Sequence, residues 1–323
     1  MSTSPALIAV DIDGTLLTRR GLILPGTRAE FARARAAGAT ILLASGRPVG
    51  GLRRLAERLH LPTDGLVFAG SNGSVTVEAT SGDVIARTSL DHDLVLRMTA
   101  LTAEHGILTM LCDGDDLVVD QPDHPQVRIE LAGNGLGCRP VADLRTLAPG
   151  EARVDKLLMY GHPDQLRPFS TVFIEEFGEE VEHAFSAPFY FEATALGVDK
   201  GSALAALAAD RGVDVTDSVA FGDNGNDIPL LRAAGVGVAM GNAIEETKAA
   251  ADRVTASNEN EGIAAVLADL YGDGDPAPPV EAPDVEPMYH REVDLTSDDS
   301  AFILQDPPQD PHHSGGDGTR GRP

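Results

Sequence analysis

Short apolar segments that alternate with helix-like segments restrict the fold of this sequence more than any other feature. Apolar runs at residues 6–10, 40–44 and 66–69 are bounded by turn-forming residues, and helical patterns at residues 25–37 and 50–59 separate them. Parallel strands need a crossover connection, which is usually a helix, so this alternation is typical of a parallel sheet. We therefore predict an α/β fold with a doubly wound parallel sheet.

The same alternation returns near Lys200 after a long interruption. We expect the returning elements at residues 200–211, 218–222, 227–234, 237–240, 244–251 and 261–270. The interruption begins near Thr76 and has another pattern, with hairpin-like strands around Gly82 and Asp83 and further elements at 94–104, 117–119 and 154–160. We predict a Rossmann-like core of residues 1–78 and 189–270, with an α+β domain of residues 79–188 inserted into it.

The last segment, residues 271–323, has the composition of a disordered chain. It contains 9 Pro and 6 Gly among 53 residues, with 12 acidic and 3 basic side chains. So little apolar surface cannot offset the entropy lost when the segment becomes ordered. We predict that this acidic tail is disordered.

The charge and the apolar content exclude some classes of function. The formal net charge is −25, of which the tail contributes 3 − 12 = −9, leaving −16 on the other residues. Nucleic acid is therefore not an expected partner, because binding it requires a basic surface. No stretch has the ~20 apolar residues that span a bilayer, and no secretory signal precedes Asp11. With two cysteines in neither a zinc-site nor a disulfide spacing, we expect a cytoplasmic protein without a membrane partner, its oligomeric state left open.

Polar residues directly follow the expected strands. Asp11 and Asp13 come after the first apolar run, and Ser45 comes after the second. Asp223 and Asp227 follow a later strand. Ligands of open parallel sheets bind beyond the carboxyl ends of the strands, so we expect these side chains at one edge. Two like charges ~4 Å apart repel by about 4 kcal/mol at an effective dielectric of ~20, so the cluster needs a cation, and oxygen ligands point to Mg²⁺.

Lys200 is one of only three lysines among 25 basic residues. It stands at the expected start of a helix, where the macrodipole disfavours a cation by roughly 0.3–1 kcal/mol. A lysine in that position indicates a nearby anion. The expected uncharged donors to phosphate oxygens are the Ser45 hydroxyl and the backbone around Gly46, Gly14 and Thr15. Together these groups predict a site for a phosphoryl group.

Four short motifs occur in a fixed order along the chain. They are Asp-Ile-Asp-Gly-Thr-Leu at 11–16, Ser-Gly-Arg at 45–47, Asp-Lys-Gly at 199–201 and Gly-Asp-Asn-Gly-Asn-Asp at 222–227. With these motifs, residues 6–270 resemble the haloacid dehalogenase superfamily, and within it the Cof-type phosphatases. The segments Ser-Asn-Gly at 71–73 and Ala-Met-Gly-Asn-Ala at 239–243 are similar to that family too.

The resemblance implies roles for individual residues. Asp11 would be the nucleophile that forms an aspartyl-phosphate, and Asp13 would be the general acid and base. Ser45 and Lys200 would hold the phosphoryl group. The metal would be held by the Asp11 carboxylate, the Asp13 carbonyl and Asp223, with Asp227 and Asn226 supporting this metal set, and Asn226 would also contact the phosphate.

Motif spacing selects the subfamily. Only 34 residues separate Asp11 from Ser45 (45 − 11), whereas 155 separate Ser45 from Lys200 (200 − 45). The first interval has room for one crossover helix, so the inserted domain must follow the second motif. The Cof-type resemblance implies that this insertion is a large α/β cap that closes over the site.

We therefore expect a Mg²⁺-dependent phosphatase of small phosphate monoesters, such as a sugar phosphate or a phosphorylated cofactor or metabolite. A phosphomutase or phosphotransferase of the same superfamily is an alternative, although phosphomutases usually have a smaller cap between the first two motifs. A metabolite-sensing homologue that has lost turnover is another alternative, but it would lack a catalytic group, and all are present.

Some side chains keep two interpretations. Arg47 could contact substrate or form a surface salt bridge. Lys156, in an expected strand of the insertion, could face substrate, although a solvated lysine is favoured. Asp113, Asp115 and Asp116 are expected to form no more than an acidic turn.

Overall fold

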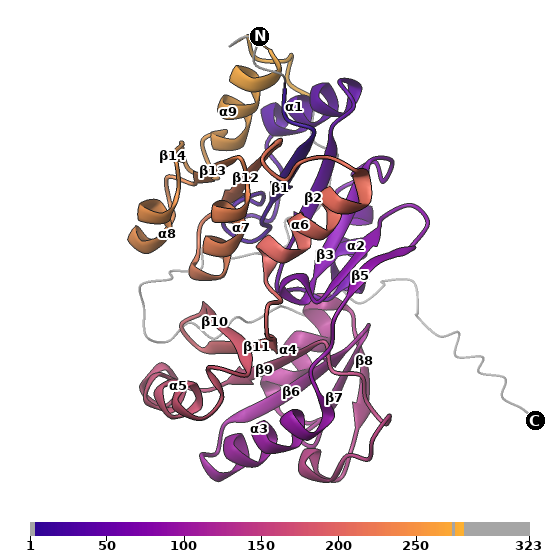
Figure 1. Ribbon diagram of the computed structural model, residues 1–323, viewed down its shortest axis with the longest axis vertical. Coiled ribbons are helices and arrows are strands. Elements are labelled where there is room, and N and C mark those ends of the chain that lie inside the picture. The colour runs from indigo at the N-terminus through magenta and orange to yellow at the C-terminus, as the bar shows by residue number, and fades with distance from the viewer. Residues whose placement is uncertain (1–3, 273–274, 281–323) are drawn as a thin grey trace, which may run out of the picture.

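The computed structural model describes residues 4–272 and 275–280 and contains two sheets, one above the other in Figure 1. The first sheet has the strand order β14-β13-β12-β1-β2-β3-β4-β5. Its strands are β1 Leu7–Val10, β2 Thr40–Ala44, β3 Leu66–Gly70, β4 Val75–Glu78, β5 Val84–Arg87, β12 Ser218–Gly222, β13 Val236–Ala239 and β14 Arg253–Val254. The strands from β14 to β3 run parallel, and β4 and β5 are antiparallel additions at the edge.

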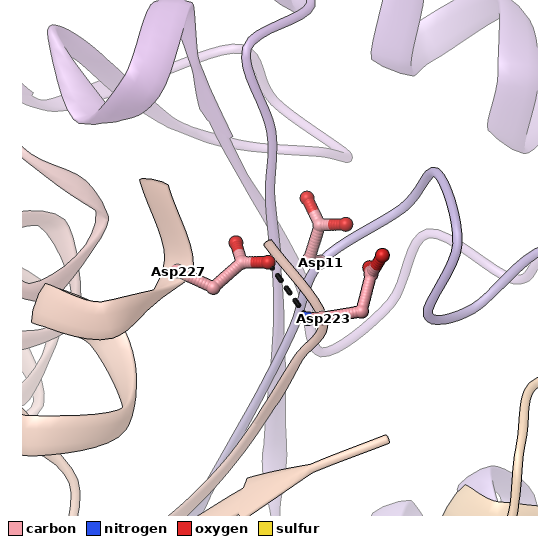
Figure 2. A group of neighbouring side chains, drawn as sticks. All are labelled: Asp11, Asp223 and Asp227. Carbon is pink, nitrogen blue, oxygen red and sulfur yellow. Dashed lines mark hydrogen bonds between the residues drawn. The ribbon is translucent and has the colours of Figure 1, made fainter. Parts of the chain in front are cut away.

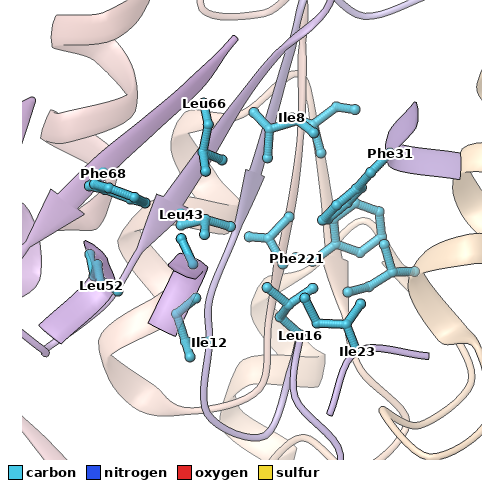
Figure 3. Packing of buried hydrophobic residues seen from close by; sticks show 14 of the residues in the cluster. Ile8, Ile12, Leu16, Ile23, Phe31, Leu43, Leu52, Leu66, Phe68 and Phe221 are labelled. Carbon is cyan, nitrogen blue, oxygen red and sulfur yellow. The ribbon is translucent and has the colours of Figure 1, made fainter. Parts of the chain in front are cut away.

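Helices cover both faces of the first sheet. They are α1 Pro25–Ala36, α2 Val49–Arg58, α6 Lys200–Arg211, α7 Ile228–Ala233, α8 Glu245–Ala250 and α9 Gly262–Tyr271. Successive residues of a strand face opposite sides. Ile8 therefore packs with Phe31 and Phe221 on the side of α1, α2 and α9 (Figure 3), whereas Leu7 and Ala9 pack against α6 and α7. The doubly wound α/β prediction is thus confirmed.

The second sheet has the strand order β10-β11-β9-β6-β7-β8 and is antiparallel except between β7 and β8. Its strands are β6 Leu108–Asp113, β7 Asp116–Val119, β8 Gly137–Pro140, β9 Lys156–Tyr160, β10 Val181–Ala187 and β11 Tyr190–Ala195. Two helices, α3 His92–Glu104 and α5 Pro163–Phe177, pack on one face, and α4 Pro125–Asn134 packs on the other. Short 3₁₀ turns are at Ser71–Gly73, Leu144–Thr146 and Gly225–Asp227.

The β4–β5 hairpin differs from the expected organisation. The sequence placed residue 84 and its neighbours in the inserted domain, but β5 pairs with β4 and lengthens the first sheet. A change from apolar runs to a hairpin marks a change of strand direction, which is not the same as a change of domain. The domain limits themselves stay a prediction.

The described residues of the acidic tail contact α1 and the segment before β1. Tyr271 is the last residue of α9, and its hydroxyl donates to the carbonyl of Pro5. Backbone amides of Ala277 and Val280 donate to the Glu30 carboxylate and to the carbonyl of Pro25 in α1. The first residues of the predicted tail thus make contacts with residues 5–30, the disorder of the tail stays a prediction, and the rest of the tail lies outside the described residues. Within 4–272 and 275–280, no helix is long and apolar enough to cross a membrane.

Candidate active site

Asp11 and Asp223 lie at the carboxyl ends of two paired strands. The register of β1 pairs Val10 with Phe221 of β12 and with Leu43 of β2. The residues that follow these strands therefore lie at one edge of the sheet, as the sequence predicts. Figure 2 shows the carboxylates of Asp11, Asp223 and Asp227 gathered at this edge.

Lys200 is buried between two of these carboxylates. Its Nζ donates to Asp11 Oδ1 and to Asp227 Oδ1, each at 2.6 Å, and the side chain is 1 % exposed. Helix α6 starts at Lys200 because Asp199 caps it, its carboxylate accepting from the amide of Ser202 at 2.7 Å. Burial alone lowers the pKa of Lys200, but Asp11 and Asp227 outweigh burial and raise the pKa, so the ammonium stays charged.

Asp227 uses both of its oxygens within the protein. Oδ1 accepts from Lys200, and Oδ2 accepts from the amides of Asp223 and Asn224 at 2.9 Å each. These contacts hold the turn after β12, so that the carboxylate of Asp223 faces Asp11. The sequence predicts Asp227 as a supporting member of the metal set, and in the structure both of its oxygens have partners within the protein.

The carboxylates fit a divalent cation. One oxygen from each of Asp11, Asp223 and Asp227 can be chosen so that all three lie within 4.8 Å of one another, and carboxylate oxygens are ligands that Mg²⁺ prefers. When its three carboxylates are ionised, the cluster carries three negative charges against the single positive charge of Lys200. Burial, followed by Asp227, raises the pKa of Asp11 well above its usual value, and the same two causes raise the pKa of Asp223 to about 7. The donors, their spacing and the excess charge all suit Mg²⁺.

Gly14 and Thr15 shape the wall beside Asp223. The Thr15 hydroxyl donates to Asp223 Oδ1 at 2.6 Å. Gly14 has φ +89°, and a Cβ at that position would lie 2.4 Å from Asp223 Oδ2. Only glycine allows the loop after β1 to adopt this conformation and to approach Asp223 so closely. Both residues were predicted phosphate contacts, and the structure places them at the carboxylate cluster.

The Ser-Gly-Arg loop follows β2 at the same edge. Ser45 is buried, and its hydroxyl accepts from the amide of Arg47 at 3.2 Å. Arg47 donates from Nε and Nη2 to the two carboxylate oxygens of Asp13, at 2.8 and 2.7 Å. Of the two interpretations that the sequence left for Arg47, the structure thus shows a salt bridge, and the partner is the predicted acid/base residue.

Asn226 lies beside Asn72, a buried residue of the Ser-Asn-Gly segment that was noted only for its similarity to the family. Its Nδ2 donates to Asn72 Oδ1 at 3.3 Å. Asn72 has φ +57°, in the left-handed region that asparagine tolerates better than most residues. Its own Nδ2 donates to Glu192 Oε2 in β11. Glu192 was not predicted, because its strand shows no pattern that separates its two faces.

The structure contradicts the expectation that Lys156 is exposed to solvent. A solvated lysine was favoured at this position, but Lys156 is 3 % exposed, and its Nζ donates to the carbonyl of Gly46 at 2.7 Å and to Glu192 at 3.0 Å. Its place in the apolar strand 156–160, together with the scarcity of lysine, was the available signal. The structure therefore places Lys156 against the Ser-Gly-Arg loop.

The acidic turn at 113–116 makes a contact with α2 that the sequence did not predict. It joins β6 to β7, as a turn would, and Asp115 Oδ1 accepts from the amide of Gly50 at 2.8 Å. Gly50 lies in the first turn of α2, whose unpaired amides favour a carboxylate. This hydrogen bond connects the β6–β7 turn of the second sheet to the helix that follows the Ser-Gly-Arg loop.

Comparison with known proteins agrees with the fold. Residues 8–267 match the family of haloacid dehalogenase-like hydrolases, and the chain belongs to that family. Membership, together with relatives that are named phosphatases, makes it a hydrolase of phosphoric monoesters.

Two relatives and one solved structure illustrate the likeness. The pyridoxal phosphate phosphatase YbhA of Escherichia coli is 30 % identical over 265 residues, which is 80 % of this chain and 96 % of YbhA. The 5-amino-6-(5-phospho-D-ribitylamino)uracil phosphatase YitU of Bacillus subtilis is 29 % identical over 275 residues, 84 % of this chain and 99 % of YitU. The crystal structure of a haloacid dehalogenase-like hydrolase from Bacteroides thetaiotaomicron has a TM-score of 0.71 and 28 % identity, and covers 83 % of this chain and all of that chain.

Proposed function

We propose that this phosphatase hydrolyses small phosphorylated metabolites with Mg²⁺, through a phosphoryl group held covalently on Asp11. The observation that carries the proposal is the buried cluster in which Lys200 joins Asp11 and Asp227 at 2.6 Å while Asp223 faces Asp11. An arrangement of one ammonium and three carboxylates at the ends of parallel strands suits a dianionic phosphate bound through a divalent ion.

The carboxylates of Asp11 and Asp223 would hold the ion, and Asp227 would orient them. When bound, Mg²⁺ neutralises charge on the transferring phosphoryl group. Lys200 would supply a further positive charge to the same group, and the Ser45 hydroxyl an uncharged donor. These residues bind and orient the phosphate so that one oxygen of Asp11 lies in line with the ester bond.

The reaction then needs two displacements. An oxygen of Asp11 forms a bond to phosphorus as the ester bond breaks, and Asp13 gives its proton to the departing oxygen. In the second displacement water attacks phosphorus, Asp13 takes a proton from that water, and Asp11 leaves as a carboxylate with release of inorganic phosphate. Atoms and charges balance without an additional reactant.

The salt bridge between Arg47 and Asp13 bears on the first displacement. A carboxylate whose two oxygens both accept from a guanidinium has no proton to donate. We therefore propose that Arg47 turns toward the bound substrate and releases Asp13 to act as the acid. This assignment combines the two interpretations that the sequence left open for Arg47.

The relatives guide the choice of substrates. YbhA and YitU are named for pyridoxal phosphate and for a phosphorylated ribitylaminouracil, so phosphorylated cofactors and their precursors come first, followed by sugar phosphates. The test is a turnover screen over these compounds and over nucleotides, with Mg²⁺ or with a chelator. Phosphate release that requires Mg²⁺ supports the proposal, and release that a chelator leaves unchanged contradicts it.

A further inference from the structure

A buried ion pair of the second sheet contacts the segments that follow β2 and β3 of the first sheet. Alternation along β9 puts Lys156 and Leu158 on the face opposite α3 and α5. Glu192 of β11 is the neighbour of Leu158 in the β9–β11 ladder and therefore lies on the same face. Lys156 Nζ and Glu192 Oε1 are 3.0 Å apart, and the two residues are 3 % and 5 % exposed. Among the described residues, the pair therefore lies between the sheets and out of contact with bulk water.

The pair contacts one of the four motifs directly and is linked to a second through Asn72. Lys156 donates to the carbonyl of Gly46 at 2.7 Å. Glu192 accepts from Asn72, whose Oδ1 accepts from Asn226 at 3.3 Å. A continuous chain of hydrogen bonds thus runs from β9 and β11 to the Ser-Gly-Arg loop and to the turn after β12.

Close packing couples the loop to the pair. A Cβ added at Gly46 would lie 3.3 Å from Asn72 Oδ1 and 3.4 Å from Glu192 Oε2. The backbone of the loop therefore fits directly against Asn72 and Glu192. A shift of either charged side chain would shift the carbonyl of Gly46, and with it the neighbouring Ser45 hydroxyl.

Stability does not account for such a pair, because removing two charges from water costs more than burying apolar side chains of the same volume. The pair is instead placed where it can set the geometry of a loop. We propose that Lys156 and Glu192 are positioning residues, which hold loop 45–47 in the conformation that receives the phosphoryl group. The inference rests on the proposed function, since it assigns the loop to phosphate.

This role differs from contact with the leaving group. A residue that acts through the loop affects the phosphoryl end, which is common to all substrates and to inorganic phosphate. Its loss should therefore weaken inorganic phosphate as a ligand and should lower kcat/KM by the same factor for different leaving groups. A residue that touched the leaving group would change some substrates and leave inorganic phosphate unaffected.

The test compares wild type with the double variant Lys156→Met/Glu192→Gln, which removes both charges together and leaves no unpaired one. Inorganic phosphate is titrated calorimetrically with Mg²⁺ present, and kcat/KM is measured for an aryl phosphate and an alkyl phosphate. We expect phosphate to bind at least tenfold more weakly, and both kcat/KM values to fall at least tenfold and within threefold of each other. The matched control is Lys248→Met/Glu245→Gln, a surface pair in α8 with a separation of 2.9 Å, expected to match wild type.

Two results overturn the inference. One is a folded double variant whose phosphate affinity stays within threefold of wild type, and the other is a loss confined to one leaving group. If the double variant does not fold, Lys156→Gln/Glu192→Gln, which also removes both charges and keeps an acceptor for Asn72, is judged by the same criteria. Calorimetry needs no turnover, so a wild type that binds phosphate without hydrolysing esters would contradict the proposed function and still decide this inference.

Discussion

Asp11 is subject to opposing demands. A nucleophile must be a carboxylate, but burial and the neighbouring Asp227 raise the pKa of Asp11. Lys200 counteracts both effects, through its charge and through its hydrogen bond at 2.6 Å. The ammonium thus serves the ionised form of Asp11 as well as the phosphate that Asp11 would attack.

Removing this ammonium should be costly for turnover. We expect Lys200→Ala to lose at least ~2.7 kcal/mol of transition-state stabilisation, about 100-fold in kcat, by analogy with the loss of one oxyanion donor. Steady-state kinetics with an aryl phosphate measure the change, and Lys248→Ala, on the surface of α8, is the control. A decrease of less than tenfold in a folded Lys200→Ala protein would show that the lysine is structural.

At the scale of elements, the core strands were predictable because they are buried on both faces. Parallel strands such as β1 and β2 form continuous apolar runs that stand out in a sequence. The second sheet was predicted only in part. Helix α4 buries only Gln126 and Val127, and β10 is mostly half-buried, so neither shows a strong hydrophobic pattern.

The two cysteines differ by the position of their strands. Cys112 is in β6 and buried, and burial raises its pKa to about 12, whereas Cys138 is exposed in the edge strand β8. A folded-state pKa above the ordinary value of 9.0 means that the folded protein keeps the thiol protonated. The burial of Cys112 is therefore compatible with folding below about pH 9, and stability falls as pH rises from about 9 toward about 12.

Thiol labelling checks this difference. At pH 8 the native protein should react rapidly at Cys138 alone, because Cys112 presents no thiolate, and a second thiol should react after unfolding in guanidinium. Cys138→Ser should abolish the fast reaction. Rapid labelling of Cys112 in that variant would mean that β6 is not covered as the structure shows.

At the scale of the whole molecule, the spacing of the motifs predicted an insertion after the second motif. It could not predict which side chains of the insertion reach the site. The contact of Lys156 with Gly46 depends on the face of β9 that carries the lysine and on how the two sheets are stacked (Figure 1). Neither quantity is encoded in a local pattern of residues.

The excess negative charge of the carboxylate cluster predicts that metal stabilises the folded chain. Addition of Mg²⁺ at about 100 times its dissociation constant should increase the free energy of unfolding by about 2.7 kcal/mol, because the unfolded chain lacks the site. Thermal unfolding with and without a chelator measures the increase. Asp223→Asn, which removes one ligand, should lose most of it. A full increase in that variant would place the metal elsewhere.

The most direct measurement is the detection of a phosphoryl group on Asp11. In Asp13→Asn, an aryl phosphate should still transfer its phosphoryl group, because the aryl oxide leaves without a proton, whereas water attack should be slow without the base. We expect a burst of aryl alcohol stoichiometric with enzyme, and acid-quenched protein phosphorylated on the peptide that contains Asp11. A burst without phosphorylation of that peptide, or phosphorylation that persists in Asp11→Asn/Asp13→Asn, would contradict the covalent mechanism.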